Sequence, residues 1–192
     1  MRFVDEFRNG AVAKQLIKKL NQYKGREINI MEVCGTHTMS IFKYGIRGVL
    51  PENIKLISGP GCPVCVTPQS YIDAALEISE KKDVILTTFG DMMRVPGKNS
   101  SLLKRKAEGG DIRMVYSAMD ALEIAMNNPD KKVIFLSVGF ETTTPMTALT
   151  VLEAKKKNIN NIFFLTSHKI MPPAMEALVQ DKELKIDGFL LP

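Results

Sequence analysis

Two cysteines three positions apart, Cys62 and Cys65, lie in the glycine- and proline-rich stretch SGPGCPVCVTP, residues 58–68. Two intervening residues are the spacing of thiol–disulfide oxidoreductase sites, in which the two thiols can close into a small disulfide ring. Pro63 stiffens such a ring, and the preceding GPG favours a sharp turn. The motif therefore predicts a dithiol that is reversibly oxidised.

A second motif, CGTHT at residues 34–38, pairs Cys34 with His37. We expect it at a strand-to-helix turn, where backbone N–H groups and the helix dipole favour a thiolate. Thiolate and imidazole are ligands that suit iron or zinc, and Gly35 lets the backbone approach a ligand closely. Cys34 and His37 are thus candidate metal ligands. The structural alternative is a small buried cysteine beside a hydrogen-bonded histidine.

The two motifs together offer a rival interpretation, because Cys34, His37, Cys62 and Cys65 make up the Cys₃His ligand set of structural zinc sites. Zinc knuckles normally replace a hydrophobic core in small modules, whereas these pairs follow predicted buried strands in a chain that has a core. The spacing and context favour the redox interpretation and leave a zinc-binding domain as the alternative.

The stretch GFETTTP, residues 139–145, joins a predicted strand to a predicted helix through one carboxylate and three hydroxyls. Glu141 is a candidate catalytic residue, as a proton carrier or hydrogen-bond acceptor; the alternative is a helix N-cap in which one threonine caps and Glu141 favours the positive end of the dipole. Asp91 and Arg94 in FGDMMRVPG could form only a surface ion pair, and His168 could be only a solvent-facing loop residue.

Short β-branched apolar runs alternate along the chain with segments of helical periodicity. They predict strands over residues 27–33, 55–58, 83–89, 112–117, 132–138, 161–166 and 187–191. The helical segments cover residues 4–23, 40–45, 68–81, 101–107, 118–127, 143–156 and 173–180. Strict alternation of this kind predicts an α/β fold with mostly parallel sheets and right-handed crossovers.

Glycine-rich AEGGD and the turn NNPDKK suggest two successive Rossmann-like units that face a cleft. We place the boundary at residue 117, so that residues 1–117 carry CGTHT and GPGCPVC and residues 118–192 carry GFETTTP. Nearly every predicted strand runs into one of the polar or glycine-containing signatures at its carboxyl end, which is where open parallel sheets bind ligands. The sequence stops at the apolar run DGFLLP, and a buried parallel strand needs layers on both faces, so we expect the second unit to be incomplete.

Composition excludes several classes of protein. The 192 residues are 45% hydrophobic and 24% charged, as in ordinary globular proteins, and the longest apolar runs are far shorter than a membrane helix. The net charge of +5 comes from short basic pieces without stacked aromatic residues, which argues against nucleic-acid binding. The N-terminal MRFVDEFRNG lacks a signal-peptide core, so we expect a cytoplasmic protein. Three cysteines in a reducing cytosol favour redox or metal roles over a disulfide framework.

Four stretches, EVCGTHT, SGPGCPVCVTP, TTFGDMMRVPG and VGFETTTP, together resemble the HypD family of NiFe-hydrogenase maturation factors. The resemblance covers almost the whole chain with the motifs in the same order. It implies two α/β lobes and a scaffold rather than a conventional enzyme. With a small partner, HypC, such a scaffold holds an iron ion that receives cyanide and carbon monoxide, as Fe(CN)2CO, before delivery to the NiFe-hydrogenase large subunit. HypE supplies the cyanide.

The resemblance also implies roles for single residues. Cys34 matches the family's proposed iron-binding cysteine, with His37 beside it, and Cys62 and Cys65 match the pair thought to exchange electrons as dithiol and disulfide. The candidate cofactor-binding residues within these motifs are Gly35, Thr36, Gly59 and Gly61.

The chain departs from the family at one point. HypD proteins continue into a C-terminal segment whose cysteines hold a four-iron, four-sulfur cluster, whereas no cysteine follows Cys65 in this sequence. This iron–sulfur cluster cannot form here by the family's means, so the resemblance implies either an incomplete protein or a lineage that has lost the electron relay, and we expect the former. The alternative function is a thiol–disulfide oxidoreductase-like or Cys₃His zinc-binding α/β domain.

Overall fold

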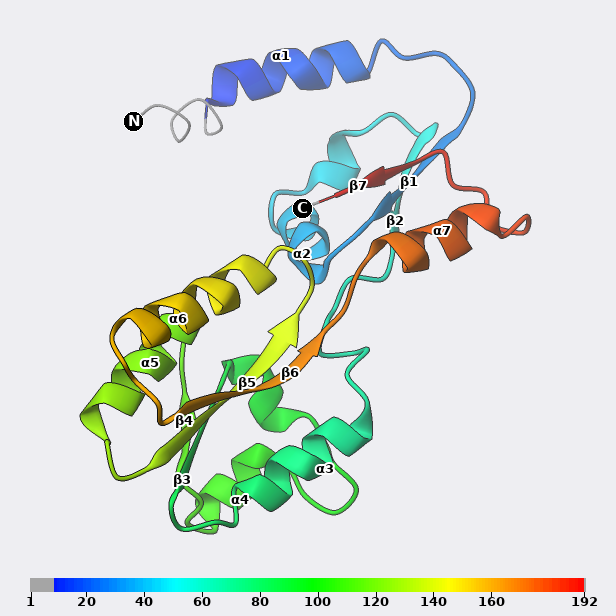
Figure 1. The fold of residues 1–192 in the computed structure, drawn as a ribbon. Coiled ribbons are helices and arrows are strands. Elements are labelled where there is room, and N and C mark those ends of the chain that lie inside the picture. Colours follow the sequence, from blue (N-terminus) through cyan, green and yellow to red (C-terminus); the bar gives the residue numbers. More distant parts are fainter. Residues whose placement is uncertain (1–8, 192) are drawn as a thin grey trace. The chain divides into compact units, whose positions relative to one another are not determined.

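Strands and helices alternate through residues 9–191, the part of the chain that the computed structural model describes (Figure 1). The strands are β1 (Ile28–Glu32), β2 (Ile54–Ser58), β3 (Val84–Thr88), β4 (Ile112–Met114), β5 (Lys132–Gly139), β6 (Ile162–His168) and β7 (Gly188–Leu190). The α-helices are α1 (Gly10–Leu20), α2 (Gly35–Lys43), α3 (Gln69–Ile78), α4 (Leu102–Ala107), α5 (Ala118–Asn127), α6 (Thr144–Lys156) and α7 (Pro172–Gln180). Two 3₁₀ turns, η2 (Ile46–Val49) and η3 (Gly90–Arg94), complete the elements.

Each predicted strand and helix has a counterpart in this order, and the α/β class is confirmed. The first helix was expected over residues 4–23, of which 4–8 lie outside the described residues. Its described part begins at Gly10, where the Asn9 side chain accepts hydrogen bonds from the N–H groups of Ala11 and Val12. None of the described helices is long and apolar enough to cross a lipid bilayer.

The chain forms two compact units, and their division differs from the predicted boundary at residue 117. Of the described residues, those up to Cys62 and from Met175 onward form unit 1, and residues Pro63–Ala174 form unit 2. Residue 117 falls inside unit 2 because β3 and β5, which flank it in sequence, pair directly in one sheet. Unit 2 is therefore inserted into unit 1, and the two units are nested in the sequence rather than successive.

Unit 1 contains a parallel three-stranded sheet in the order β2-β1-β7. The central strand, β1, pairs along its whole length with β2 and through Ile30, Met31 and Glu32 with β7. Neighbours on both sides bury the carboxyl end of β1, where Met31 and Glu32 are followed by the equally buried Val33. This buried strand end leads directly into the CGTHT motif.

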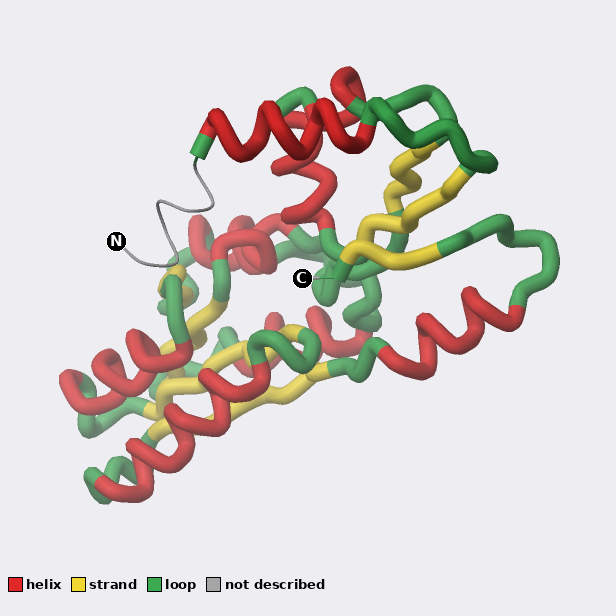
Figure 2. Tube along the Cα trace, turned by 90° about the horizontal axis from the view of Figure 1, so that it is seen from above, coloured by secondary structure: helices red, strands yellow, loops and turns green. Residues whose placement is uncertain are grey.

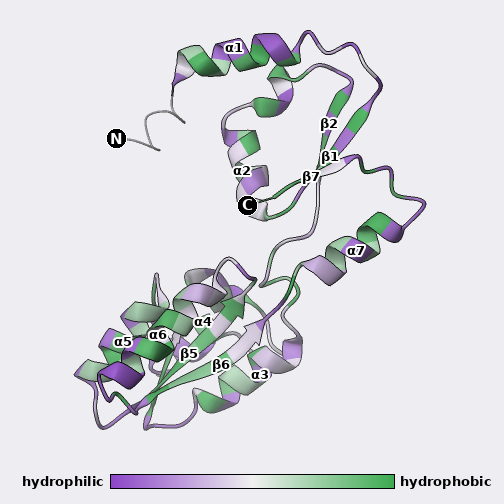
Figure 3. Ribbon diagram, turned by 45° about the horizontal axis from the view of Figure 1, so that its top comes forward, coloured by the Kyte–Doolittle hydropathy of each residue, from purple (hydrophilic) through white to green (hydrophobic). Residues whose placement is uncertain are grey.

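Unit 2 contains a parallel four-stranded sheet in the order β4-β3-β5-β6. Helices α3 and α4 lie on one face of this sheet and α5 and α6 on the other (Figures 1 and 2). Because both faces are covered, every residue of β3 is buried, as expected for a parallel strand rich in apolar residues. Figure 3 shows β6 changing from hydrophobic residues to hydrophilic ones at its carboxyl end.

The strand order of unit 2 has a topological switch point between β3 and β5. From β3 the chain goes to β4 on one side, and it then returns to β5 and β6 on the other side. In open α/β sheets, ligands bind beyond the carboxyl ends of the strands at such a point. The loops that follow β3 and β5 are FGDMMRVPG and FETTTP, so the fold directs two of the predicted motifs to this edge.

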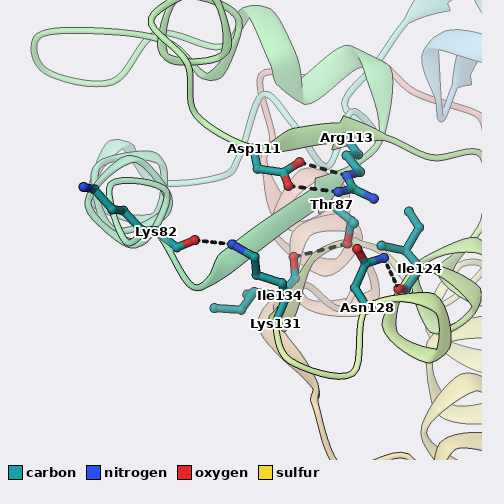
Figure 4. Close-up of polar contacts among 8 residues, drawn as sticks. All are labelled: Lys82, Thr87, Asp111, Arg113, Ile124, Asn128, Lys131 and Ile134. Carbon is teal, nitrogen blue, oxygen red and sulfur yellow. Dashed lines mark hydrogen bonds and ion pairs between the residues drawn. The ribbon is translucent and has the colours of Figure 1, made fainter.

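Polar contacts secure unit 2 away from these loops (Figure 4). Buried Thr87 donates its hydroxyl to the Ile134 carbonyl, 3.2 Å away, which satisfies a polar group inside the sheet. At the amino ends of β3 and β5, Lys131 donates to the Lys82 carbonyl, and Asn128 donates to the Ile124 carbonyl at 2.8 Å. These contacts fix the turns that feed the two central strands.

Candidate functional site

The CGTHT motif forms a sharp strand-to-helix elbow at the end of β1. Helix α2 begins at Gly35, five residues before the predicted helix at 40–45, so the motif occupies the elbow and the first helical turn. Cys34 is the N-cap residue of α2, and its backbone has φ 93° and ψ 128°. A positive φ at a non-glycine residue is strained and occurs preferentially at functional sites.

The GPG loop packs against the backbone of Cys34. The Cys34 N–H donates to the Pro60 carbonyl at 3.3 Å, and the Cys34 carbonyl accepts from the His37 N–H at 3.1 Å. Gly61 has φ 142°, and a Cβ at this position would lie 2.3 Å from the Cys34 nitrogen. Only glycine permits so close an approach. The structure therefore brings together, within unit 1, the predicted metal motif and the loop that precedes the dithiol.

The other candidate cofactor-binding residues differ in their surroundings. The Gly59 N–H donates to the Glu32 carbonyl at 2.9 Å, and a Cβ on Gly59 would lie 2.4 Å from the Met31 side chain. Gly59 and Gly61 are thus required by packing against β1 and its end. Gly35 has open space around its Cα, and Thr36 is exposed. Cofactor binding by these four residues stays a prediction.

His37 is half-buried and contacts the last strand of the sheet. Its Nδ1 atom lies 3.3 Å from the Leu190 carbonyl, which also accepts from the Val33 N–H at 2.9 Å. A backbone carbonyl at this distance favours the tautomer with the proton on Nδ1, which leaves the Nε2 lone pair for a metal ion. Strand β7 therefore orients the imidazole of the predicted ligand.

Glu32 belongs to this site and was missed by the sequence analysis. Its side chain is completely buried, two residues before Cys34. Thr38 donates to Oε2 at 2.6 Å, and Arg47 donates to Oε1 at 3.0 Å. Burial alone would raise the pKa of Glu32, but the hydrogen bonds from Thr38 and Arg47 outweigh it and hold the pKa below its ordinary value. Strand β1 (INIME) also contains the polar Asn29, so a glutamate at its end gave no clear signal of this role in the sequence.

The dithiol lies where the chain passes from one unit to the other. Half-buried Cys62 is the last residue of the first segment of unit 1, and exposed Cys65 lies in unit 2, in the turn that precedes α3. Thr67 fixes this turn, since its hydroxyl donates to the Pro63 carbonyl at 2.8 Å and its N–H donates to the Val64 carbonyl at 3.1 Å.

Cys65 opens onto a hollow of about 420 Å³ in unit 2. The turn η3, which follows β3, contributes Asp91 and Arg94 to the same hollow. Both side chains are exposed because the two residues between them, Met92 and Met93, are buried and anchor the turn. The ion pairs of the described residues do not include one between Asp91 and Arg94, so the structure gives no support to the surface-pair interpretation.

Glu141 connects the loops that follow β5 and β6. It is exposed, and its Oε1 atom accepts a hydrogen bond from the Met171 N–H at 2.8 Å. A hollow of about 410 Å³ lies between these loops, with Glu141, Thr144 and His168 among its lining residues. The predicted threonine cap is wrong: the hydroxyls of Thr143 and Thr144 donate to the Phe140 carbonyl instead of accepting from the first N–H groups of α6.

His168 is the last residue of β6 and not a solvent-facing loop residue. It is half-buried, and its Nε2 atom lies 3.4 Å from the hydroxyl of the buried Ser137. Burial lowers the pKa of His168 from its ordinary value, which favours the neutral imidazole. His168 and Glu141 line the same hollow at the edge of unit 2.

Side chains that could bind a metal ion do not form a cluster of three or more in residues 9–191: no three His, Cys, Asp or Glu residues there lie close enough together to hold a metal ion. The Cys₃His zinc site stays an alternative prediction, because its fourth residue, Cys65, belongs to unit 2 and the other three belong to unit 1.

Comparison with known proteins identifies the family. A family model described as HypD, hydrogenase formation hypA family, matches residues 11–192. The chain is 48% identical to hydrogenase maturation factor HypD of Escherichia coli (strain K12), and the match covers 100% of this chain and 53% of that protein. The same shares hold for the HypD proteins of Azotobacter vinelandii, at 46% identity, and Rhodobacter capsulatus, at 44%. This chain spans about half the length of the curated relatives it matches, and over that length it belongs to the HypD family of hydrogenase maturation factors.

Proposed function

We propose that this chain acts as a maturation scaffold for NiFe-hydrogenase. With HypC it binds an iron ion as cargo, supports the attachment of cyanide and carbon monoxide to give Fe(CN)2CO, and passes the product toward the hydrogenase large subunit. Family membership supports the general role. The observation that carries the specific one is the Cys34 elbow, in which a strained backbone places Cys34 at the N-cap of α2, at the carboxyl end of a central strand, and its carbonyl accepts a hydrogen bond from the His37 N–H.

Iron with cyanide and carbonyl ligands favours soft anionic donors, so a thiolate suits it better than a carboxylate such as Glu141. Cys34 is the proposed ligand, and coordination itself deprotonates the thiol. His37 is a second ligand or orients the site through its ring. Because these two side chains leave most positions on the iron to other donors, the scaffold requires a partner, and HypC fills that role in this proposal.

Cys62 and Cys65 are the proposed electron source. Oxidation of the two thiols to one disulfide would release two electrons and two protons to a reduction step that accompanies ligand assembly; HypE is the proposed supplier of cyanide. Glu141 is the proposed proton carrier, supported by its place with His168 in the lining of one hollow at the edge of unit 2. No step is assigned to an iron–sulfur cluster, since the three cysteines of this sequence do not supply its four thiolates.

Infrared spectroscopy of the anaerobically purified complex with HypC tests the iron site. We expect Cys34→Ala to abolish the cyanide and carbonyl bands while the fold stays intact, and His37→Ala to weaken or shift them. Ser40→Ala, an exposed position on the same helix, is the matched control and keeps wild-type bands. Wild-type bands in Cys34→Ala would move the iron site elsewhere.

Alkylation and mass mapping before and after mild reduction test the dithiol. We expect Cys62 and Cys65 to become reactive together after reduction, with Cys34 outside the pair. A pair that stays unreactive because it holds zinc would contradict the redox role.

The exposure of Cys65 favours a second candidate function, thiol–disulfide exchange with another protein. A mixed disulfide trapped by Cys62→Ser would support this second function.

A further inference from the structure

We propose that Glu32 is a positioning residue for Cys34: its buried carboxylate clamps α2 to β1 and holds the Cys34 elbow and the GPG loop in one arrangement. The inference rests on the proposed function only for the statement that the Cys34 thiol binds iron. The clamp itself is present in the metal-free chain.

Both oxygens of the carboxylate are used. Glu32 has no exposed side-chain surface, and a buried carboxylate is tolerated only when it is paired and hydrogen-bonded. The Thr38 hydroxyl donates to Oε2 at 2.6 Å, and the Arg47 guanidinium donates to Oε1 at 3.0 Å. A glutamate on the surface needs no such partners. The burial of Glu32 opposite these two donors therefore indicates a specific structural role.

The two donors belong to different segments around the thiol. Thr38 lies in the first turns of α2, four residues after Cys34, and Arg47 lies in η2. The same guanidinium nitrogen of Arg47 is 3.3 Å from the hydroxyl of Ser58, the last residue of β2. Ser58 precedes Gly59, whose N–H donates to the Glu32 carbonyl. Glu32 thus connects the start of α2, the end of β2 and the GPG loop, in part through Arg47.

The clamp matters because the Cys34 backbone is strained. If Cys34 continued β1 with an ordinary negative φ, the two-residue alternation of a strand would place its side chain on the same buried face as Glu32. The positive φ turns the chain away from that course. Strained backbone persists only where its surroundings over-determine it, and the Thr38–Glu32 hydrogen bond fixes the helix that follows the elbow.

The test is the alkylation rate of Cys34 by iodoacetamide in the reduced, metal-free chain, followed by mass spectrometry of the Cys34 peptide. Thr38→Val removes only the donating hydroxyl and should slow Cys34 alkylation by about fivefold or more, because the relaxed elbow buries the thiol. Thr38→Ser keeps the hydroxyl and should restore the wild-type rate. Glu32→Gln, which cannot accept from both donors, should behave like Thr38→Val.

The controls separate positioning from loss of structure. The alkylation rate of Cys65, in unit 2, serves as the internal reference in each sample, and circular dichroism checks the fold. Glu27→Gln removes an exposed carboxylate whose ion pair with Lys55 is 2.9 Å long, and it should leave the Cys34 rate unchanged.

A wild-type Cys34 rate in folded Thr38→Val would overturn the proposal, as would equal slowing in Thr38→Ser. The assay contains no iron, so its outcome is independent of whether Cys34 binds iron. Infrared bands in the Thr38→Val complex with HypC then give a second readout, and a clamp that orients the iron ligand predicts that they are shifted or weakened.

Discussion

Gly61 lies so close to the Cys34 backbone that a side chain has no room there. A Cβ would sit 2.3 Å from the Cys34 nitrogen, and the φ of 142° disfavours any other residue. We expect Gly61→Ala to lower the free energy of unfolding by about 2 kcal/mol, measured by urea denaturation. Gly48→Ala is the control, because Gly48 has open space and an ordinary φ. Equal stability of the two variants would contradict the packing role of Gly61.

His168 should make stability depend on pH. Its folded-state pKa lies below the ordinary value of 6.5, so the unfolded chain binds the proton more readily. The free energy of unfolding should therefore fall as the pH drops through about 6.5, and the loss should stop once the folded-state histidine also protonates. Denaturation at about pH 8 and about pH 5 should show a smaller difference in His168→Gln than in the wild type. An identical pH dependence in the wild type and His168→Gln would contradict this prediction.

The motifs themselves could be found from the sequence, whereas the residues that hold them in position could not. Cys34, His37, Cys62 and Cys65 stand out because sulfur and imidazole at short, regular spacing are uncommon outside functional sites. Glu32 looks like an ordinary strand-end residue until its partners are known. Its role depends on Thr38 and Arg47, which approach only after β1, α2 and η2 are packed.

The strands were predicted well because runs of buried β-branched and apolar residues are a local signal, whereas the start of α2 is not locally determined. The residues of CGTHT are modest helix formers, and glycine and threonine weaken any propensity-based assignment. Tertiary contacts decide the outcome: Thr38 is held by Glu32 and His37 by Leu190, so the helix begins at Gly35. These contacts reach across the fold and cannot be read from the motif.

Helix α5, by contrast, carries its start signal in the sequence and begins at the predicted residue. Ser117 caps it by accepting from the Asp120 N–H at 3.2 Å, while Asp120 accepts from the Ser117 N–H at 3.1 Å. Removing this reciprocal pair with Asp120→Ala should lower the free energy of unfolding by about 1 kcal/mol, measured by chemical denaturation. Glu123→Ala, an exposed position on the same helix, should cost much less. Similar losses in both variants would argue against the cap.

The division into nested units was beyond sequence analysis because it depends on which distant strands pair. Turn-rich stretches near residues 107–111 and 127–132 suggested a boundary between them. In the structure β3 and β5 pair across that interval, and β7 returns to pair with β1 from the far end of the chain. Local composition marks turns, whereas unit boundaries follow strand order, and parallel crossovers allow several orders for one set of strands.

Unequal cores predict unequal local stability in the two units. Among the described residues of unit 1, the buried hydrophobic ones are Met31, Val33 and Ile41, and all the other buried hydrophobic residues described lie in unit 2. Each buried aliphatic side chain contributes about 1.5–3 kcal/mol to the free energy of unfolding, so local opening of unit 2 should cost more free energy than opening of unit 1. We therefore expect amides of β3 and β5 to exchange hydrogen more slowly than those of β1, the central strand of unit 1.

Native-state hydrogen exchange followed by mass spectrometry would measure this difference strand by strand. The exchange rates of β1, β3 and β5 can be compared directly, because all three are central strands with parallel neighbours on both sides. Equal exchange rates would mean that the two units open together despite their unequal cores. Slower exchange in β3 and β5 would mean that unit 1, which carries Cys34 and the Glu32 clamp, opens more easily, and its local stability would then rest largely on the polar contacts around Glu32.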